Sequence, residues 1–305
     1  MAEKQRSRRA GFECSLPLAL IALAAATLAG PGCSCRGGKA IQRPYAAPTA
    51  QSMLGDLAAV GARARSYQID SLMEYWSDGD RVQGTVLLMG ERGAYVRIQT
   101  YFFSNHNPSD LACNGAGFKY IDTRNNCQLT GPCNRDSIAQ LLRLSLHPDD
   151  FLLMVVGATP IIEHTEASAV WDAKNGHEVL TLTARDRSAT QTITLSGRHC
   201  DGMLPGLSGA DKGCPWAVVS SVVRDTEGKE LWNLSNKEFH TVLGIDGVEF
   251  RVPEKTLFKQ PPANADLLIR WRERTINPEI DHSKFDLTIP PGLRWCGDEA
   301  EAAAP

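Results

Sequence analysis

The sequence feature that most constrains the fold is a switch of hydrophobic period, from 3.6 residues to 2, near residue 66. Three consecutive segments then alternate apolar and polar side chains, separated by the turn signals Asp78-Gly79-Asp80 and Glu91-Arg92-Gly93. Such alternation indicates strands with one buried face, and tight turns between them indicate antiparallel pairing. The sequence therefore predicts an antiparallel meander at 66–77, 81–90 and 94–102.

The rest of the chain continues this alternation and adds three helical segments. Ser52 is typical of an N-cap, and apolar residues spaced three and four apart after it predict a helix at 52–65. Further helices are predicted at 136–145 and at 148–157, where a proline and two acids open the segment and Gly157 ends it. Further strands are predicted at 110–113, 117–122, 126–129, 168–173, 177–185, 189–196, 216–225, 229–235, 238–243, 248–252 and 265–274.

No linker divides residues 53–297, and the chain has neither a solenoid repeat nor a GxGxxG motif, so we predict one mainly β (α+β) domain. A sheet of ten or so strands curls, and its apolar concave face must be filled by helices or by a ligand. The competing interpretation is an ordinary packed core. The residues that we place on the concave face are Ile69, Met73, Val86, Leu88, Val96, Ile98, Trp171, Trp232 and Trp271.

The N-terminus carries an export signal. Residues 1–13 are basic, the stretch from Cys14 to Gly30 is uncharged, and small residues lead to Cys33. The uncharged stretch is shorter than the about 20 apolar residues of a membrane helix, and this order of segments is typical of a signal peptide. Small residues directly before Cys33 resemble the lipobox of bacterial lipoproteins, which implies that Cys33 is acylated. Cys35 is a weaker candidate, and secretion with soluble release is the alternative.

We therefore expect four parts: a signal peptide at 1–32, a flexible tether at 33–52, a folded domain at 53–297 and a disordered tail at 298–305. The tether is rich in Gly, Pro, Ala and Arg and shows no periodicity. Such a protein resides in the cell envelope, attached to a membrane that we take to be the outer membrane, with its domain in the periplasm.

Six cysteines fall in the predicted domain and support export, because disulfides persist in oxidising compartments. Six cysteines allow 15 pairings, and short turn-rich loops favour Cys127–Cys133 and Cys200–Cys214. Zinc is the alternative, but no CxxC motif is present to support it.

The order of elements resembles the LolA/LolB type of lipoprotein carrier, and more narrowly LolA-like lipoproteins of myxobacteria and other Gram-negative bacteria. The resemblance covers about 53–295, and it implies a strongly curved, incomplete antiparallel barrel whose helices lid an apolar cavity for acyl chains. In LolB an apolar residue of the loop after the third strand contacts the membrane, which makes Phe103 its counterpart here; a buried Phe is the alternative. The segments that carry the resemblance are YQIDSLMEYWSDGDRVQGTVLLMGERGAYVRIQTY, LACNGAGFKYIDTRNNCQLTGPCNRDSIAQLLRLSLHPDDFLLMVVG and FDLTIPPGLRW.

Other function classes find little support. The net charge is −3 and no basic run lies beyond the first ten residues, which argues against a nucleic-acid partner. GxSxG, HExxH and P-loop motifs are missing, and the aspartates at 149 and 150 are better placed to cap a helix than to act as acids or bases.

We therefore expect a non-enzymatic lipoprotein, without metal or cofactor, that binds lipid or acyl chains. Its partners would be the membrane, through the lipid anchor, and other lipoproteins or envelope proteins. The alternatives are a structural or interaction lipoprotein of an envelope complex, with a packed and ligand-free barrel, and an unrecognised hydrolase. A continuous apolar void favours carriage, whereas a solid interior favours the structural role.

Overall fold

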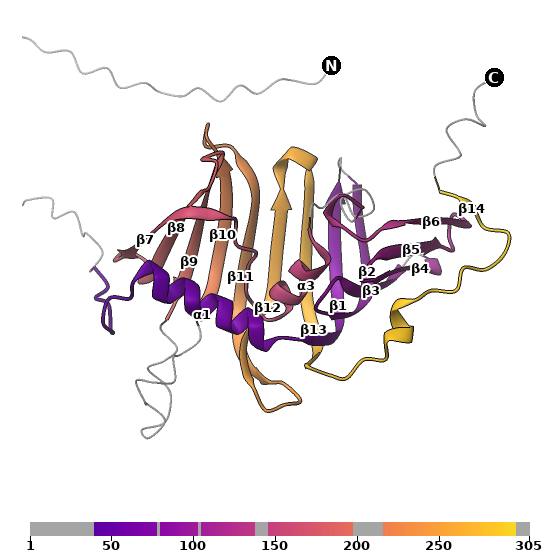
Figure 1. The fold of residues 1–305 in the computed structure, drawn as a ribbon, viewed down its shortest axis with the longest axis horizontal. Helices are drawn as coiled ribbons and strands as arrows, with labels where there is room; N and C mark the ends of the chain where they lie inside the picture. The colour runs from indigo at the N-terminus through magenta and orange to yellow at the C-terminus, as the bar shows by residue number, and fades with distance from the viewer. Residues whose placement is uncertain (1–39, 78–79, 103–104, 138–145, 198–215, 297–305) are drawn as a thin grey trace, which may run out of the picture. The chain divides into compact units, whose positions relative to one another are not determined.

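The computed structural model describes residues 40–77, 80–102, 105–137, 146–197 and 216–296. Within them, one sheet of 14 strands carries two α-helices on the same face, α1 (Ala50–Arg63) and α3 (Pro148–Val155) (Figure 1). The strands are β1 (Ser66–Ser77), β2 (Asp80–Glu91), β3 (Tyr95–Phe102), β4 (Asn105–Asn114), β5 (Gly117–Asp122), β6 (Cys127–Pro132), β7 (His164–Asp172), β8 (His177–Ala184), β9 (Ala189–Ser196), β10 (Ala217–Asp225), β11 (Glu230–Leu243), β12 (Glu249–Gln260), β13 (Ala265–Ile276) and β14 (Arg294–Trp295).

The sheet is one antiparallel layer that does not close. Its strand order is β14-β6-β5-β4-β3-β2-β1-β13-β12-β11-β10-β9-β8-β7, and the short pairing of β14 with β6 is parallel. Because β1 pairs with both β2 and β13, the first strand lies mid-sheet and joins two arms, each a run of sequential hairpins. This arrangement confirms the predicted fold class, a mainly β, curved and incomplete barrel with a few helices.

The predicted meander is confirmed and shows how alternation builds the inner face. Ile69 of β1 lies opposite Leu88 of β2, which lies opposite Ile98 of β3, and Ile98 lies opposite Leu111 of β4. All four side chains are at most 7% exposed. Since residues on one face of adjacent strands are direct neighbours, this row is a continuous apolar stripe across four strands.

The helices begin and end at residues that favour these positions. In α1 the N-cap is Thr49 rather than the predicted Ser52, and the Thr49 side chain accepts a hydrogen bond from the Ser52 N–H. In α3 His147 is the N-cap and shares a capping box with Asp150, while Gly157 ends the helix at a φ of 72°, as predicted. The helix predicted at 136–145 lies mostly outside the described residues.

Two apolar clusters form beneath the helices. The larger joins α3 to β1–β5 and β11–β13, and the smaller joins α1, through Met53 and Leu57, to β8, β9 and β10. The two strands predicted at 229–235 and 238–243 are one strand, β11. Glu238 adopts a φ of 59° and has no partner on β12, but the register is the same on both sides of it, so the strand continues through this irregular residue.

The disulfides correct the predicted Cys127–Cys133 pair. Cys113 bonds Cys133, and Cys127 bonds Cys296, which ties β6 to the C-terminal segment. Cys127 begins β6 and Cys133 follows its last residue, so an extended strand holds the two about 20 Å apart. The second predicted pair, Cys200 and Cys214, lies outside the described residues.

Candidate functional site

Most of the residues predicted to line the concave face are core residues. Met73 and Trp232 are partly buried and pack against the larger cluster. Trp171 lies apart from it, on β7, where its indole N–H donates to the Ile41 carbonyl. Two further predicted sites, Cys33 and Phe103, fall outside the described residues. The predicted residues buried in the larger cluster are Ile69, Val86, Leu88, Val96, Ile98 and Trp271.

Helix α3 packs onto this inner face. Four of its eight residues, Phe151, Leu152, Met154 and Val155, are at most 2% exposed. The Asp149 carboxylate accepts hydrogen bonds from the backbone N–H groups of the 93–94 turn, the shortest at 2.9 Å, and so fastens the helix start to the β2–β3 hairpin. The concave face beneath α3 is therefore filled by protein.

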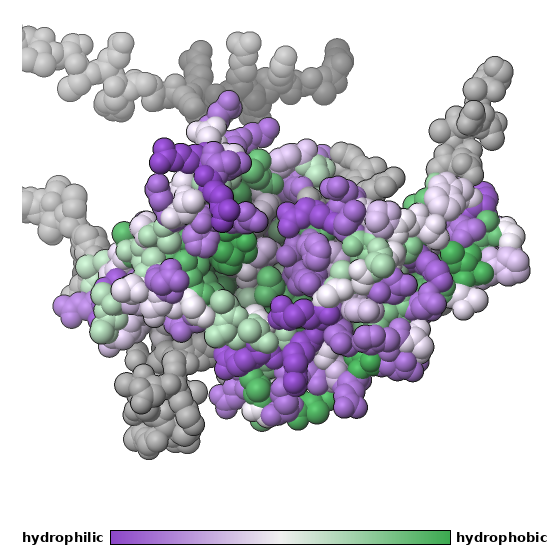
Figure 2. Space-filling model, in the orientation of Figure 1, coloured by the Kyte–Doolittle hydropathy of each residue, from purple (hydrophilic) through white to green (hydrophobic). Residues whose placement is uncertain are grey.

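The apolar space lies instead beside α1. A hollow of about 520 Å³, which we call the α1 hollow, separates α1 from residues 158–163, which we call the connector because they join α3 to β7. Figure 2 shows apolar residues in a hollow on the face that carries α1, bordered by hydrophilic ones. Its lining residues are Gln51, Leu54, Gly55, Leu57, Ala58, Gly61, Ala62, Arg92, Leu153, Ala158, Thr159, Ile161 and His164.

Small residues on α1 create this space. A Cβ atom at Gly55 would meet no heavy atom within 4 Å. Ala58 and Ala62 follow it at spacings of three and four residues, so the three share one helix face. Arg92 borders the hollow but donates to the Gly61 and Ala64 carbonyls at the end of α1, so its charge is directed to the helix terminus.

A second hollow, of about 310 Å³, lies on the other side of the connector, and we call it the β11 hollow. Trp232 and Phe258 stack with ring centroids 5.8 Å apart to form its apolar part. Arg135 and Asp150, 3.7 Å apart, supply its polar end, and burial raises the pKa of Asp150 above its ordinary value. Its lining residues are Arg135, Leu146, Asp150, Pro160, Ile161, Ile162, Glu163, Trp232 and Phe258.

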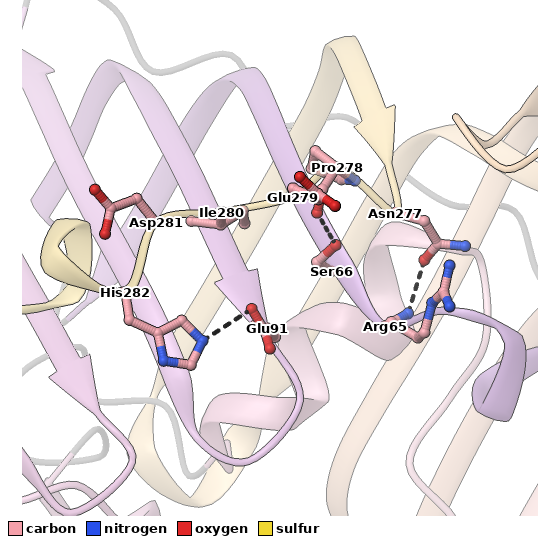
Figure 3. A pocket seen from close by; sticks show the side chains of 9 residues that line it. All are labelled: Arg65, Ser66, Glu91, Asn277, Pro278, Glu279, Ile280, Asp281 and His282. Atoms are coloured by element: carbon pink, nitrogen blue, oxygen red, sulfur yellow. Dashed lines mark hydrogen bonds and ion pairs between the residues drawn. The ribbon is translucent and has the colours of Figure 1, made fainter.

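A third pocket, of about 720 Å³, is polar and lies where the segment after β13 crosses the ends of β1 and β2 (Figure 3). His282 Nε2 lies 3.2 Å from Glu91 Oε2, and Asn277 Oδ1 accepts from the Arg65 N–H. The Ser66 hydroxyl donates to the Pro278 carbonyl. Because its walls carry charged and hydrogen-bonded groups, this pocket is unsuited to an apolar chain.

Residues 41–45, within the segment predicted as a tether, contact β7 and β8. The Ile41 N–H donates to the Ala173 carbonyl, and the Arg43 guanidinium lies over the Trp171 ring. Tyr45 makes edge contacts with Trp171 and Trp216. The chain is thus held against the sheet before α1 begins.

Of the residues predicted to line a cavity, Trp232 lies in the β11 hollow, whereas the other residues that line the two hollows were not predicted as cavity residues. The predicted cavity residues all lie on strands, whereas Leu54, Ala58 and Ile161 come from a helix and from an irregular segment. The available signal was the spacing of the small residues Gly55, Ala58 and Ala62, which places them on one helix face. Among the described residues, no group of three or more His, Cys, Asp or Glu side chains is placed to hold a metal ion. No helix there is long and apolar enough to cross a membrane.

No protein-family model and no curated protein matches the sequence. Solved structures with a similar fold include a LolA superfamily protein from Nitrosomonas europaea, at 10% identity and a TM-score of 0.49, covering 79% of this chain and 99% of that one. A DUF1329 family protein from Desulfovibrio piger is also 10% identical, with a TM-score of 0.47, covering 79% and 98%. A domain proposed for outer membrane lipoprotein sorting in Vibrio parahaemolyticus has 10% identity and a TM-score of 0.46, covering 78% and 97%. These likenesses concern the fold.

Proposed function

We propose that this protein is an exported, non-enzymatic envelope lipoprotein that binds acyl chains in the α1 hollow and the β11 hollow. Its ligand is a lipid or the acylated end of another lipoprotein, which it receives or hands over at the membrane that holds its own anchor. The narrower kinship with myxobacterial lipoproteins and a position at the outer membrane belong to this proposal.

The observation that carries the proposal is apolar space beside α1 that side chains leave open. Both hollows fall within the range of about 300–1,000 Å³ common for small-molecule sites, and their walls are largely aliphatic or aromatic. Each methylene moved from water into such a site contributes about 0.8 kcal/mol. A long acyl chain is therefore the ligand class that these walls favour.

The anchor would keep the hollows near a membrane. Cys33 precedes Ile41 by eight residues, so the link between a lipidated Cys33 and the sheet spans at most about 28 Å when fully extended. A domain held at this distance can exchange acyl chains with its own membrane, whereas it cannot shuttle across the periplasm.

Acyl binding is tested with the mature domain and fatty acids of increasing chain length, measured by calorimetry. Affinity should rise with each methylene and level off when the hollow is full. Ala58→Trp places an indole in the α1 hollow and should weaken binding, because it removes one of the two proposed binding spaces. Ala59→Trp is the matched control, because Ala59 is also exposed on the same helix but does not line the hollow. Equal binding by both variants would contradict the proposed site.

The anchor is tested separately in cells. Cys33→Ala should remove acylation and move the protein to the soluble fraction, while Cys35→Ala should leave it in the membrane fraction. If the Cys33 variant stays in detergent-extracted membranes, lipid attachment at Cys33 is wrong, and this outcome leaves the acyl-binding proposal unaffected.

A second candidate function is that of a structural or interaction lipoprotein, favoured by the solid interior beneath α3. Val96 and Ile269 are fully buried there. The same calorimetry decides between the two functions, because a wild-type protein whose binding does not depend on chain length fits a scaffold and excludes acyl carriage.

A further inference from the structure

The connector is the wall between the two hollows. Ala158 and Thr159 line only the α1 hollow, Pro160 and Ile162 line only the β11 hollow, and Ile161 lines both. The connector has no helical or strand structure. Whether an acyl chain meets one hollow or a continuous space therefore depends on how firmly these residues are held.

Gln191 of β9 holds this wall by its side chain. Its Oε1 accepts from the Ile162 N–H at 2.9 Å, and its Nε2 donates to the Pro160 carbonyl at 2.7 Å. The same Nε2 lies 2.9 Å from the Ser221 hydroxyl oxygen on β10. The amide thus bonds the connector backbone on both sides of Ile161.

We call these two hydrogen bonds from Gln191 to the connector backbone the clamp. Because the site is buried, glutamine suits it better than a residue that cannot make both bonds. Gln191 is 0% exposed, and beneath it Ser221 is 0% exposed as well. A buried amide needs both a donor and an acceptor partner, and the connector backbone supplies one of each. The connector is tied to neighbouring elements at its two ends, where the Ala158 N–H donates to Leu153 and the Arg185 N–H donates to the Glu163 carbonyl.

We propose that Gln191 is a specificity-determining residue of the acyl site, because it fixes the wall that limits how long a chain the α1 hollow accepts. This inference rests on the proposed function. When the clamp is released, residues 159–162 can move away from β9, and the two hollows join. A chain that overfills the α1 hollow then continues toward Trp232 and Phe258.

The test compares fatty acids by calorimetry in the wild type, in Gln191→Leu, and in Gln191→Asn, which is too short by one methylene to keep both connector bonds. Ser221→Ala is the matched control, since it leaves both bonds in place. Above the length at which wild-type affinity levels off, each added methylene should change affinity little in the wild type and in the control. In the two Gln191 variants, each added methylene above that length should still raise affinity by up to about fourfold. Hydrogen exchange should also become faster in residues 159–162.

The outcomes separate this inference from the function on which it rests. If the wild type shows no dependence on chain length, the proposed function fails. If the wild type levels off and a folded Gln191→Asn protein levels off at the same length despite faster exchange in the connector, then Gln191 has only a structural role and the inference is wrong.

Discussion

Arg43 and Glu178 lie 135 residues apart in the sequence and form a two-bonded ion pair. The Arg43 Nε and Nη2 atoms donate to the two Glu178 carboxylate oxygens at 2.6 and 3.0 Å. The Glu178 side chain is 0% exposed, whereas that of Arg43 is 23% exposed. A buried carboxylate on β8 therefore depends on a residue that precedes α1, which couples the segment nearest the proposed anchor to the edge of the sheet.

This pair gives the first prediction. Arg43→Ala leaves the Glu178 carboxylate buried without its partner, so unfolding free energy should fall by about 3–5 kcal/mol. Adding Glu178→Gln to that variant removes the uncompensated charge and should restore part of the loss. Urea unfolding of the single and double variants measures both effects. An unchanged midpoint for Arg43→Ala would show that the segment before α1 is not held by this pair.

The second prediction concerns the disulfides. Peptide mapping without reduction should recover Cys113–Cys133 and Cys127–Cys296 cross-links, and a Cys127–Cys133 peptide would contradict the structure. The chain-entropy model assigns about 3 kcal/mol to the 20-residue loop and about 5 kcal/mol to the 169-residue loop. Replacing both cysteines of the second pair by serine should therefore lower the thermal midpoint more than the same change in the first.

The third prediction is a pH dependence at Glu74, whose side chain is 6% exposed and pairs with two arginines. A hydrogen bond from Arg81, assisted by the charge of Arg270, holds the pKa of Glu74 below its ordinary value of 4.5. A lowered folded-state pKa means that the pair's stabilisation is complete above about pH 4.5 and is lost as the pH falls through the folded-state pKa.

The wild type should therefore be more stable than Glu74→Gln at neutral pH, and this difference should shrink once the pH falls below about 4.5. Urea unfolding of both proteins across a pH series measures it. A difference that stays constant into the acid range would show that the Glu74 carboxylate is not stabilised by its arginines.

The local structure could be predicted from sequence because alternation and capping are local signals. Residues such as Ile69 and Leu88 sit on the apolar side of regular strands, and their inward placement follows from period two alone. The same logic failed for the Cys127–Cys133 pair. The two cysteines are close in sequence but not in space, because the intervening residues form an extended strand.

The sequence could not locate the two hollows, because their position depends on how the helices and the connector pack against the sheet. Alternation shows that Val96 points inward, but not that Phe151 and Met154 of α3 occupy the volume above that face. Gln191 is a single polar residue on the buried face of β9, and its role depends on the path of the connector across that strand. Nothing within β9 itself encodes that path.

The last prediction tests how firmly α3 is seated. Gly157, at the end of α3, has a φ of 72°, and a Cβ there would lie 2.8 Å from the Arg251 carbonyl oxygen and 2.9 Å from Pro253 Cδ on β12. Gly228, with a φ of 82°, is the matched control, because a Cβ there would meet nothing within 4 Å. Gly228→Ala should cost only the left-handed penalty of about 1–2 kcal/mol. Gly157→Ala adds a steric clash with a backbone that cannot yield without moving α3 or β12, so its loss of unfolding free energy should be clearly larger. Equal losses in denaturant unfolding would show that the end of α3 is not pressed against β12.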